Sequence, residues 1–244
     1  MKVLILNSGA GSRLKEITSD KPKCLVELYN GETILERQVR LLSKHGFKKF
    51  IITTGPFEEK IKEKLKNNFD DLDITYVKNE RYKETNYIYS MFLAGPHLND
   101  DILLLHGDLV FDEALIEKIS SSEVKNVGLI NKTLPLPEKD FKALVVDDRI
   151  ARISVNLRGD GVFAFMPLYK LERDKFALWL KEIENFVKQG NVSVYAEEAL
   201  NLILQDVYLG YLDYSCHYCK EIDTPQDLLE VDEEIRRYDE DETS

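Results

Sequence analysis

The chain has 244 residues, of which 43% are hydrophobic and 32% charged, as in one sizeable globular domain or at most two small ones. Its formal net charge of −11 argues against nucleic acid as a partner. No apolar run approaches the roughly 18 residues of a membrane helix, and three cysteines, an odd number, argue against a disulfide framework. We therefore expect a cytoplasmic protein without a membrane partner.

Strands and helices alternate through the first half of the chain. The hydrophobic periodicity predicts strands over residues 2–8, 50–54, 74–77 and 102–106, and helices over 33–45, 58–67 and 87–94. Strands that are separated by helical crossovers pair in parallel. This half therefore predicts a parallel, doubly wound sheet.

The pattern changes in the second half. Strands are predicted over 127–131, 161–166 and 207–212, a hairpin over 144–154, and helices over 173–188 and 195–204. A last helix begins at Pro225 with Thr224 as its N-cap and extends to about residue 237. The whole chain predicts an α/β, Rossmann-like fold with a mixed, mostly parallel sheet and helices on both faces.

A glycine turn follows the first predicted strand directly. Gly9 and Gly11 allow the backbone to turn tightly and to offer bare N–H groups to an anion. Arg13 and Lys23 follow and add full positive charge where a polyphosphate would lie. A strand, a glycine turn and two spaced cations together predict a binding site for a nucleoside triphosphate.

Two aspartates stand at the ends of predicted elements. Asp108 follows the apolar run 102–105, and Asp223 lies just before the last helix. Open parallel sheets bind ligands at the carboxyl ends of their strands, and two carboxylates there suit Mg²⁺ bridging phosphate oxygens. The alternative is structural, with Asp108 capping the helix that follows Asp112 and Asp223 only starting the last helix.

These features resemble a known enzyme family. Residues 6–14, LNSGAGSRL, followed by Lys21-Pro22-Lys23, resemble the signature of nucleotidyltransferases with a glycosyltransferase-A-like fold, the nucleotide-diphospho-sugar transferase type. His106-Gly107-Asp108 and Glu221-Ile222-Asp223 match the family's two metal-binding aspartates. The chain departs from the family at Asn7-Ser8, where two alanines usually lie beside the base.

The segment 83–90 indicates the subfamily. Its sequence KETNYIYS is similar to the Asn-x-x-Tyr-Ser stretch of phosphocholine and aminoalkylphosphonate cytidylyltransferases. The resemblance implies a Mg²⁺-dependent transfer of CMP from CTP to a small phosphorylated acceptor such as phosphocholine. Because the chain shows no linker or repeat, we expect one domain, with a nucleotide-binding half (1–125), an acceptor-binding half (126–222), a C-terminal helix (223–238) and a frayed tail (239–244).

The resemblance assigns roles to individual residues. Catalysis is expected from Arg13 and Lys23, and metal binding from Asp108 and Asp223. Nucleotide binding is expected from Leu6, Asn7, Ser8, Gly9, Gly11, Asn86 and Gly107. Because aromatic faces and a carboxylate hold a quaternary ammonium group, acceptor binding is expected from Tyr195 and Glu197, with Lys142 on the acceptor phosphate.

Two other functions remain open. A sugar-1-phosphate nucleotidyltransferase shares the glycine turn and the aspartates and differs chiefly in segment 83–90. A catalytically silent nucleotide-binding regulator is the second, and the joint presence of Arg13, Lys23, Asp108 and Asp223 argues against it. Small enzymes of this kind are often dimers, so a homodimer is also open.

Overall fold

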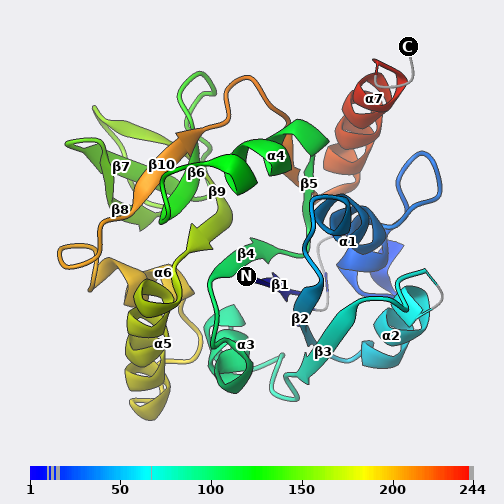
Figure 1. Ribbon diagram of the computed structural model, residues 1–244, viewed down its shortest axis with the longest axis horizontal. Coiled ribbons are helices and arrows are strands. Elements are labelled where there is room, and N and C mark those ends of the chain that lie inside the picture. The colour runs from blue at the N-terminus through cyan, green and yellow to red at the C-terminus, as the bar shows by residue number, and fades with distance from the viewer. Residues whose placement is uncertain (10, 12–13, 15–16, 67, 242–244) are drawn as a thin grey trace.

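A mixed β-sheet forms the centre of the molecule (Figure 1). The computed structural model describes residues 1–9, 11, 14, 17–66 and 68–241. The strand order is β10-β6-β9-β4-β1-β2-β3, and a hairpin of β7 and β8 joins through β7 to β9. The strands are β1 (Lys2–Leu6), β2 (Lys49–Thr54), β3 (Asp73–Lys78), β4 (Ile102–His106), β6 (Val127–Asn131), β7 (Lys142–Val146), β8 (Arg149–Ser154), β9 (Val162–Leu171) and β10 (Gly210–Asp213).

The sheet contains both parallel and antiparallel strand pairs. The strands β3, β2, β1 and β4 run parallel to one another, as β6 and β10 do. The long strand β9 lies between β4 and β6 and is antiparallel to both. The predicted fold class, an α/β fold with a mixed, mostly parallel sheet, is therefore confirmed.

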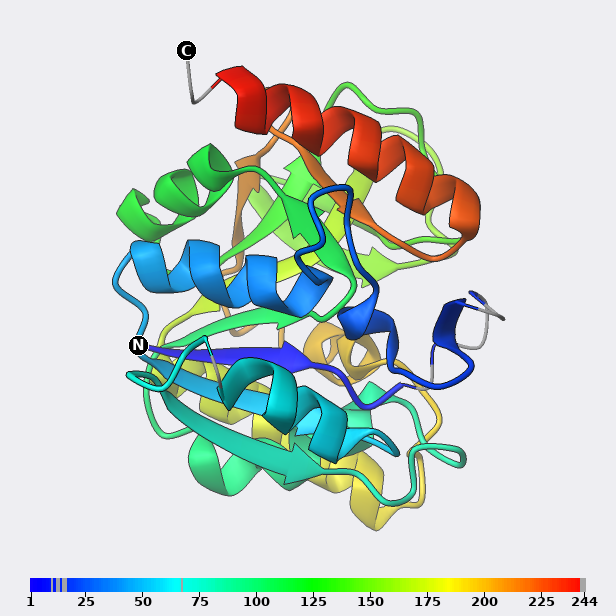
Figure 2. The ribbon, with the colours of Figure 1, turned by 90° about the vertical axis from the view of Figure 1, so that its right-hand side faces the viewer.

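Helices cover both faces of the sheet (Figure 2). They are α1 (Ile34–Lys44), α2 (Glu58–Lys66), α3 (Tyr87–Ala94), α4 (Glu113–Ser121), α5 (Arg173–Lys188), α6 (Ala196–Asn201) and α7 (Pro225–Asp241). Residues of a strand point alternately to opposite faces. Leu4 and Leu6 of β1 accordingly belong to the core that includes α3, α5 and α6, whereas Val3 and Ile5 belong to the core that includes α1, α2 and α4.

Two short strands outside the main sheet are absent from the sequence prediction. β5 (Leu109–Phe111) and β11 (Cys219–Glu221) form an antiparallel pair. The helix α7 follows β11 and buries Val231 and Ile235 in a third core cluster. Thr224 Oγ1 accepts a hydrogen bond from the Asp227 N–H at 3.2 Å, which confirms the predicted N-cap.

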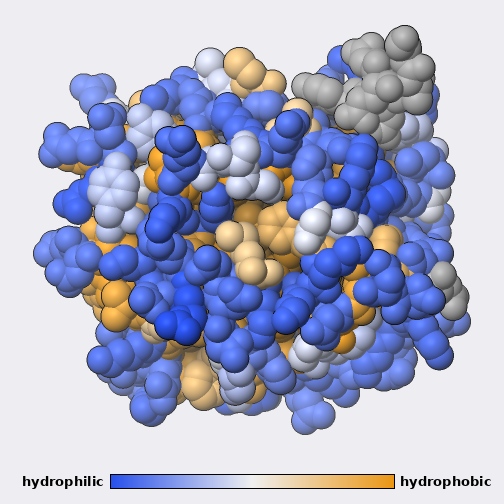
Figure 3. All heavy atoms as spheres, in the orientation of Figure 1, coloured by the Kyte–Doolittle hydropathy of each residue, from blue (hydrophilic) through white to orange (hydrophobic). Residues whose placement is uncertain are grey.

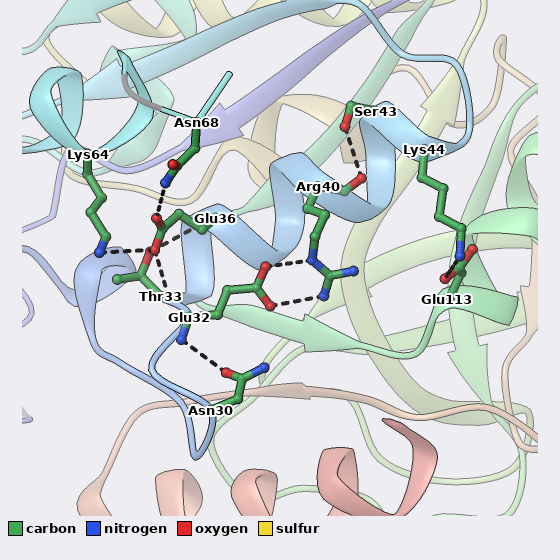
Figure 4. A network of polar contacts seen from close by, with 10 residues as sticks. All are labelled: Asn30, Glu32, Thr33, Glu36, Arg40, Ser43, Lys44, Lys64, Asn68 and Glu113. Carbon is green, nitrogen blue, oxygen red and sulfur yellow. Dashed lines mark hydrogen bonds and ion pairs between the residues drawn. The ribbon is translucent and has the colours of Figure 1, made fainter. Parts of the chain in front are cut away.

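The first turn of α1 is held by a polar network (Figure 4). Thr33 Oγ1 accepts from the Glu36 N–H at 3.2 Å, and Glu36 Oε2 accepts from the Thr33 N–H at 3.0 Å, a reciprocal capping box. Lys64 at the end of α2 lies 3.3 Å from Glu36 Oε2, and Asn68 donates to Oε1 at 2.9 Å. The network therefore joins α1 to α2.

The surface is mainly polar. Hydrophilic side chains cover most of the face drawn in Figure 3, with apolar residues visible between them. Among the helices of the described residues, none has the length and apolarity needed to cross a bilayer.

Candidate functional site

A cavity of about 610 Å³ lies at the carboxyl ends of the parallel strands. Residues 6–9 reach it from the end of β1, residues 106–108 from the end of β4, and Asn79 from the end of β3. Strands that run in parallel end at one edge of a sheet, where loops can diverge and leave a crevice. The fold therefore places the glycine turn and the first aspartate in one pocket.

The structure brings most of the predicted site residues together. The predicted residues that line the cavity are Leu6, Asn7, Ser8, Gly9, Gly11, Lys23, Asn86, Gly107, Asp108, Tyr195 and Asp223. Two others, Glu197 and Lys142, do not line it. Arg13 falls outside the described residues.

Lys23 lies between the two aspartates. Its Nζ is 2.6 Å from Asp108 Oδ2 and 2.5 Å from Asp223 Oδ1. Asp108 follows β4 directly, and the pairing of β5 with β11 brings Asp223 beside it, with the Ile222 N–H donating to the Asp108 carbonyl at 3.0 Å. Residues far apart in sequence thus form one ion cluster.

Lys23 and Asp108 keep their charges despite burial. Burial by itself would raise the pKa of Asp108, but the positive charges of Lys23 and His106 outweigh it and lower that pKa. Burial likewise acts to lower the pKa of Lys23, and the two carboxylates raise it. Lys23 and Asp108 are therefore both ionised at neutral pH.

Further oxygen donors surround the cluster. Asp108 Oδ1 is buried and has no hydrogen-bond partner among the described residues. Donor atoms of Asp140, Glu221 and Asp223 lie within 4.8 Å of one another. Carboxylate oxygens are the ligands that Mg²⁺ prefers, so the residues present fit a divalent cation. The sequence prediction omitted Glu221, although strand alternation places it on the same face as Asp223.

A second group of residues that line the cavity is polar and uncharged. Asn79 Nδ2 donates to Ser90 Oγ and to Thr85 Oγ1, each at 3.0 Å, and Ser90 Oγ donates to Ser8 Oγ at 2.9 Å. All four residues line the cavity, and the sequence prediction named only Ser8 among them. Asn79 directly follows β3. Ligands bind at the carboxyl ends of parallel strands, and this rule, which identified Asp108, could also have identified Asn79.

Aromatic rings form one wall. The Tyr195 ring lies 5.0 Å from the Phe141 ring and 5.9 Å from the Tyr87 ring, measured between centroids. All three residues line the cavity. The Tyr87 hydroxyl donates to Glu197, which also accepts from Tyr169 at 2.8 Å and is only 2% exposed. Glu197 therefore lies behind the wall and orients Tyr87, instead of facing the cavity as expected.

Lys142 is also placed differently from the expectation. It begins β7, its side chain is fully buried, and Nζ donates to the Val155 carbonyl at 2.5 Å. That bond partly offsets the free-energy cost of burying the ammonium group. Because the bond points the side chain into the protein, Lys142 does not extend into the cavity. The neighbouring Lys139 does line it.

Comparisons with known proteins agree with this geometry. The family model described as MobA-like NTP transferase domain matches residues 3–126. A CMP-5'-(3-aminopropyl)phosphonate synthase of Streptomyces rubellomurinus is 31% identical over 122 residues, which are 50% of this chain and 19% of the relative. A choline-phosphate cytidylyltransferase of Haemophilus influenzae is 32% identical over 151 residues, 60% of this chain and 62% of the relative. The chain thus spans less than two thirds of either relative.

A solved structure extends the likeness over nearly the whole chain. A putative glucose-1-phosphate thymidylyltransferase from Bacillus anthracis superimposes with a TM-score of 0.78 at 20% sequence identity, covering 95% of this chain and 94% of that one. At this identity the likeness shows a shared fold.

Proposed function

Because the chain belongs to the family of MobA-like NTP transferase domains, we propose that it is a Mg²⁺-dependent cytidylyltransferase. It transfers CMP from CTP to a small phosphorylated acceptor that carries an amine, and it releases pyrophosphate. The observation that supports this most is the position of the Lys23 ammonium group between Asp108 and Asp223 on the cavity wall. This arrangement combines a cation for phosphate with carboxylates for a metal.

The reaction needs positioning more than proton transfer. An oxygen of the acceptor's phosphate or phosphonate attacks the α-phosphorus of CTP, the bond to the β-phosphate breaks, and pyrophosphate leaves. The attacking oxygen is already anionic, so no general base is required. The protein contributes orientation and charge neutralisation.

Each part of the cavity has a task in this proposal. Lys23 stabilises the charge that develops at the α-phosphate, and the amides at Gly9 and Gly11 bind the leaving pyrophosphate. Arg13 is assigned to the same pyrophosphate on sequence grounds. Mg²⁺, held by Asp108 and Asp223, supplies further positive charge to the phosphates when it is bound.

The aromatic wall favours an acceptor with a cationic amine. Tyr87, Phe141 and Tyr195 provide ring faces that attract a cation, and the carboxylates of Asp140 and Glu221 line the same cavity. Lys139 also lines it and can bind the acceptor phosphate in place of Lys142. The names of the two relatives, one for choline phosphate and one for an aminopropylphosphonate, support an amine-bearing acceptor.

The test is pyrophosphate release with Mg²⁺. CTP, UTP, ATP, GTP and dTTP are each combined with phosphocholine, phosphoethanolamine, 2-aminoethylphosphonate and glucose 1-phosphate. We expect release with CTP and an amine-bearing acceptor, and none from Asp108→Asn. The matched control is Asp71→Asn, because Asp71 is exposed and pairs with Lys48 at the surface.

Two results would contradict the proposal. Release only with glucose 1-phosphate would assign the chain to the sugar-1-phosphate nucleotidyltransferases. Binding of CTP without release for any acceptor, in a folded protein, would favour the regulatory alternative.

A further inference from the structure

A polar side chain lies on the buried face of α1. Gln38 stands four residues after Ile34 and four before Leu42, positions that share one face of a helix. Ile34 and Leu42 are fully buried, and Gln38 itself is only 1% exposed. A buried amide costs free energy unless its N–H groups are hydrogen-bonded, whereas an apolar residue would pack here without that cost. The hydrogen bonds of Gln38 therefore indicate its role.

Both hydrogens of the Gln38 amide are donated to one turn of the main chain. Nε2 donates to the His106 carbonyl at 3.0 Å and to the Leu109 carbonyl at 2.8 Å. Gly107 and Asp108 lie between these carbonyls, so the two bonds bracket the turn that carries Asp108. The carbonyls can only accept, which fixes the orientation of the amide. Its Oε1 is thereby left buried and without a hydrogen-bond partner among the described residues.

Backbone bonds hold the middle of this turn. The Gly107 N–H donates to the Leu6 carbonyl at 3.1 Å, and the Asp108 carbonyl accepts from the Ile222 N–H at 3.0 Å. Gln38 adds bonds at the two ends of the turn and comes from α1, which packs against β5 in a shared core cluster. A side chain on a packed helix gives more precise support than one on a loop. The turn is therefore tied to the core of the domain by Gln38.

The direction of the Asp108 carboxylate depends on where this turn lies. Asp108 Oδ2 is 2.6 Å from Lys23 Nζ, and Oδ1 is buried with no hydrogen-bond partner among the described residues. An aspartate side chain is short, so a displacement of its backbone moves both carboxylate oxygens. Mg²⁺ demands near-ideal geometry at about 2.0–2.1 Å from its ligands. A small shift of the turn would therefore weaken metal binding.

Resting on the proposed role of Asp108 as a metal ligand, we propose that Gln38 is a positioning residue, which holds the turn 106–109 so that Asp108 meets a divalent cation together with Asp223. Gln38 is not among the residues that line the cavity, so it acts through Asp108 and without contacting a substrate. Polar groups that orient metal ligands contribute about 10- to 100-fold to metal affinity. The donor pair of Gln38 is such a group.

The test is the affinity for Mn²⁺ without nucleotide, followed by the electron paramagnetic resonance signal of the free ion, for the wild type, Gln38→Met and Gln38→Glu. Gln38→Met removes both donors at similar size and should weaken Mn²⁺ binding about 10-fold or more. Gln38→Glu keeps the shape and has at most one proton to donate, so its affinity should also fall. Binding of CTP in the presence of EDTA should match the wild type in both variants, because no metal takes part.

Val39→Ala is the matched control. Val39 is fully buried on the same helix and belongs to the core cluster that α1 shares with β5, but its side chain has no polar group. The substitution should lower Tm, as a cavity in the core does, and leave the affinity for Mn²⁺ unchanged. The control thus separates loss of positioning from a general loss of stability.

Equal Mn²⁺ affinity in the wild type and both Gln38 variants overturns the inference, as does an equal loss in Val39→Ala. If the wild type also releases pyrophosphate with Mg²⁺, only the inference fails. If the variants lose Mn²⁺ affinity as expected but the wild type releases no pyrophosphate, only the proposed function fails. A folded wild type that binds no Mn²⁺ overturns the inference. Circular dichroism confirms that each variant is folded, and Gln38→Glu remains decisive should Gln38→Met not fold.

Discussion

Lys23 holds together two carboxylates that would otherwise repel each other. Its ammonium group lies within 2.6 Å of an oxygen of Asp108 and of Asp223, the region that a divalent cation would occupy between them. A cation that binds there must compete with Lys23. The same residue can then be released toward the α-phosphate, where the proposed reaction needs it.

We expect Lys23→Met to lower turnover about 10²- to 10³-fold, the loss typical of a single group that stabilises transition-state charge. The variant should fold, with a lower Tm because Asp108 and Asp223 lose the ammonium group that lies between them. Mg²⁺ or Mn²⁺ should raise its Tm more than that of the wild type, since the competing ammonium group is gone. Turnover and thermal unfolding with and without metal measure these effects.

Lys66→Met is the control for that substitution, because Lys66 is exposed on α2. It should change neither turnover nor the response to metal. Near-normal turnover of Lys23→Met, or an equal response to metal in all three proteins, would contradict the proposed role of Lys23.

At the scale of elements, Glu36 connects the first turn of α1 to α2 (Figure 4). Burial would raise the pKa of Glu36, but hydrogen bonds from Thr33 and the charge of Lys64 outweigh it and lower that pKa. A carboxyl whose pKa is lowered by folding stabilises the protein above its unfolded pKa, near 4.3, and loses this contribution as the pH falls through the folded value. The contribution of the network therefore depends on pH.

We expect Glu36→Gln to lower the free energy of unfolding by about 1 kcal/mol at pH 6, the size of a capping interaction. The difference from the wild type should shrink below about pH 4. Urea unfolding between pH 3 and 7 measures this difference in the free energy of unfolding. Glu59→Gln is the control, because Glu59 is 86% exposed and pairs with Lys62 at the surface. A difference that does not change with pH would contradict the role of the Glu36 charge.

The β5–β11 pair is the element that positions Asp223. Asp112 links the pair to α4, because its Oδ1 accepts from the Leu115 N–H at 2.6 Å and its Oδ2 from the Tyr218 N–H at 2.7 Å. The side chain is therefore both the N-cap of α4 and an anchor for the residue that precedes β11. The Asp112 side chain is buried, so both bonds are made away from bulk water.

We expect Asp112→Ala to cost about 1–3 kcal/mol in the free energy of unfolding, because it removes the cap of α4 and both hydrogen bonds that the carboxylate accepts. Turnover should also fall at temperatures where the protein is still folded, since β11 loses an anchor. Urea unfolding and the pyrophosphate assay measure the two effects. Asp112→Asn keeps one acceptor oxygen and should be intermediate. Full turnover in folded Asp112→Ala would show that Asp223 is positioned without this link.

For the whole molecule, β9 joins the two halves of the chain. It lies between β4 and β6 in one continuous sheet, and the core cluster that includes Ile88 of α3 also includes Trp179 of α5. Trp179 is fully buried, donates to the Ala196 carbonyl at 2.9 Å, and is not among the residues that line the cavity. It is therefore a core residue, as its helical spacing indicates.

Trp179 is the only tryptophan of the chain, so its fluorescence should report on global unfolding. We expect a blue-shifted emission maximum that moves to the red in a single cooperative urea transition, coincident with the transition in circular dichroism. CTP should leave the folded emission spectrum unchanged. Two separate transitions would show instead that the halves unfold independently.

The sequence by itself determined the elements and much of the cavity. Hydrophobic periodicity identified the long strands and helices, because packing on a sheet face or helix stripe leaves a local pattern. The glycine turn, Lys23 and Asp108 were identifiable because the carboxyl ends of parallel strands meet at one edge. The resemblance of residues 6–14 and 83–90 added the nucleotide and the acceptor class as predictions.

Only the tertiary structure decided which side chains face the cavity. β5 and β11 are three residues each, too short for a periodic signal, and they exist through pairing across a long stretch of chain. Lys142 and Glu197 carry the charges a binding residue needs, yet each finds its partners inside the protein. The orientation of the Asn79 amide depends on the backbone N–H of Arg81. Such partners are set by contacts between distant segments, which no local pattern encodes.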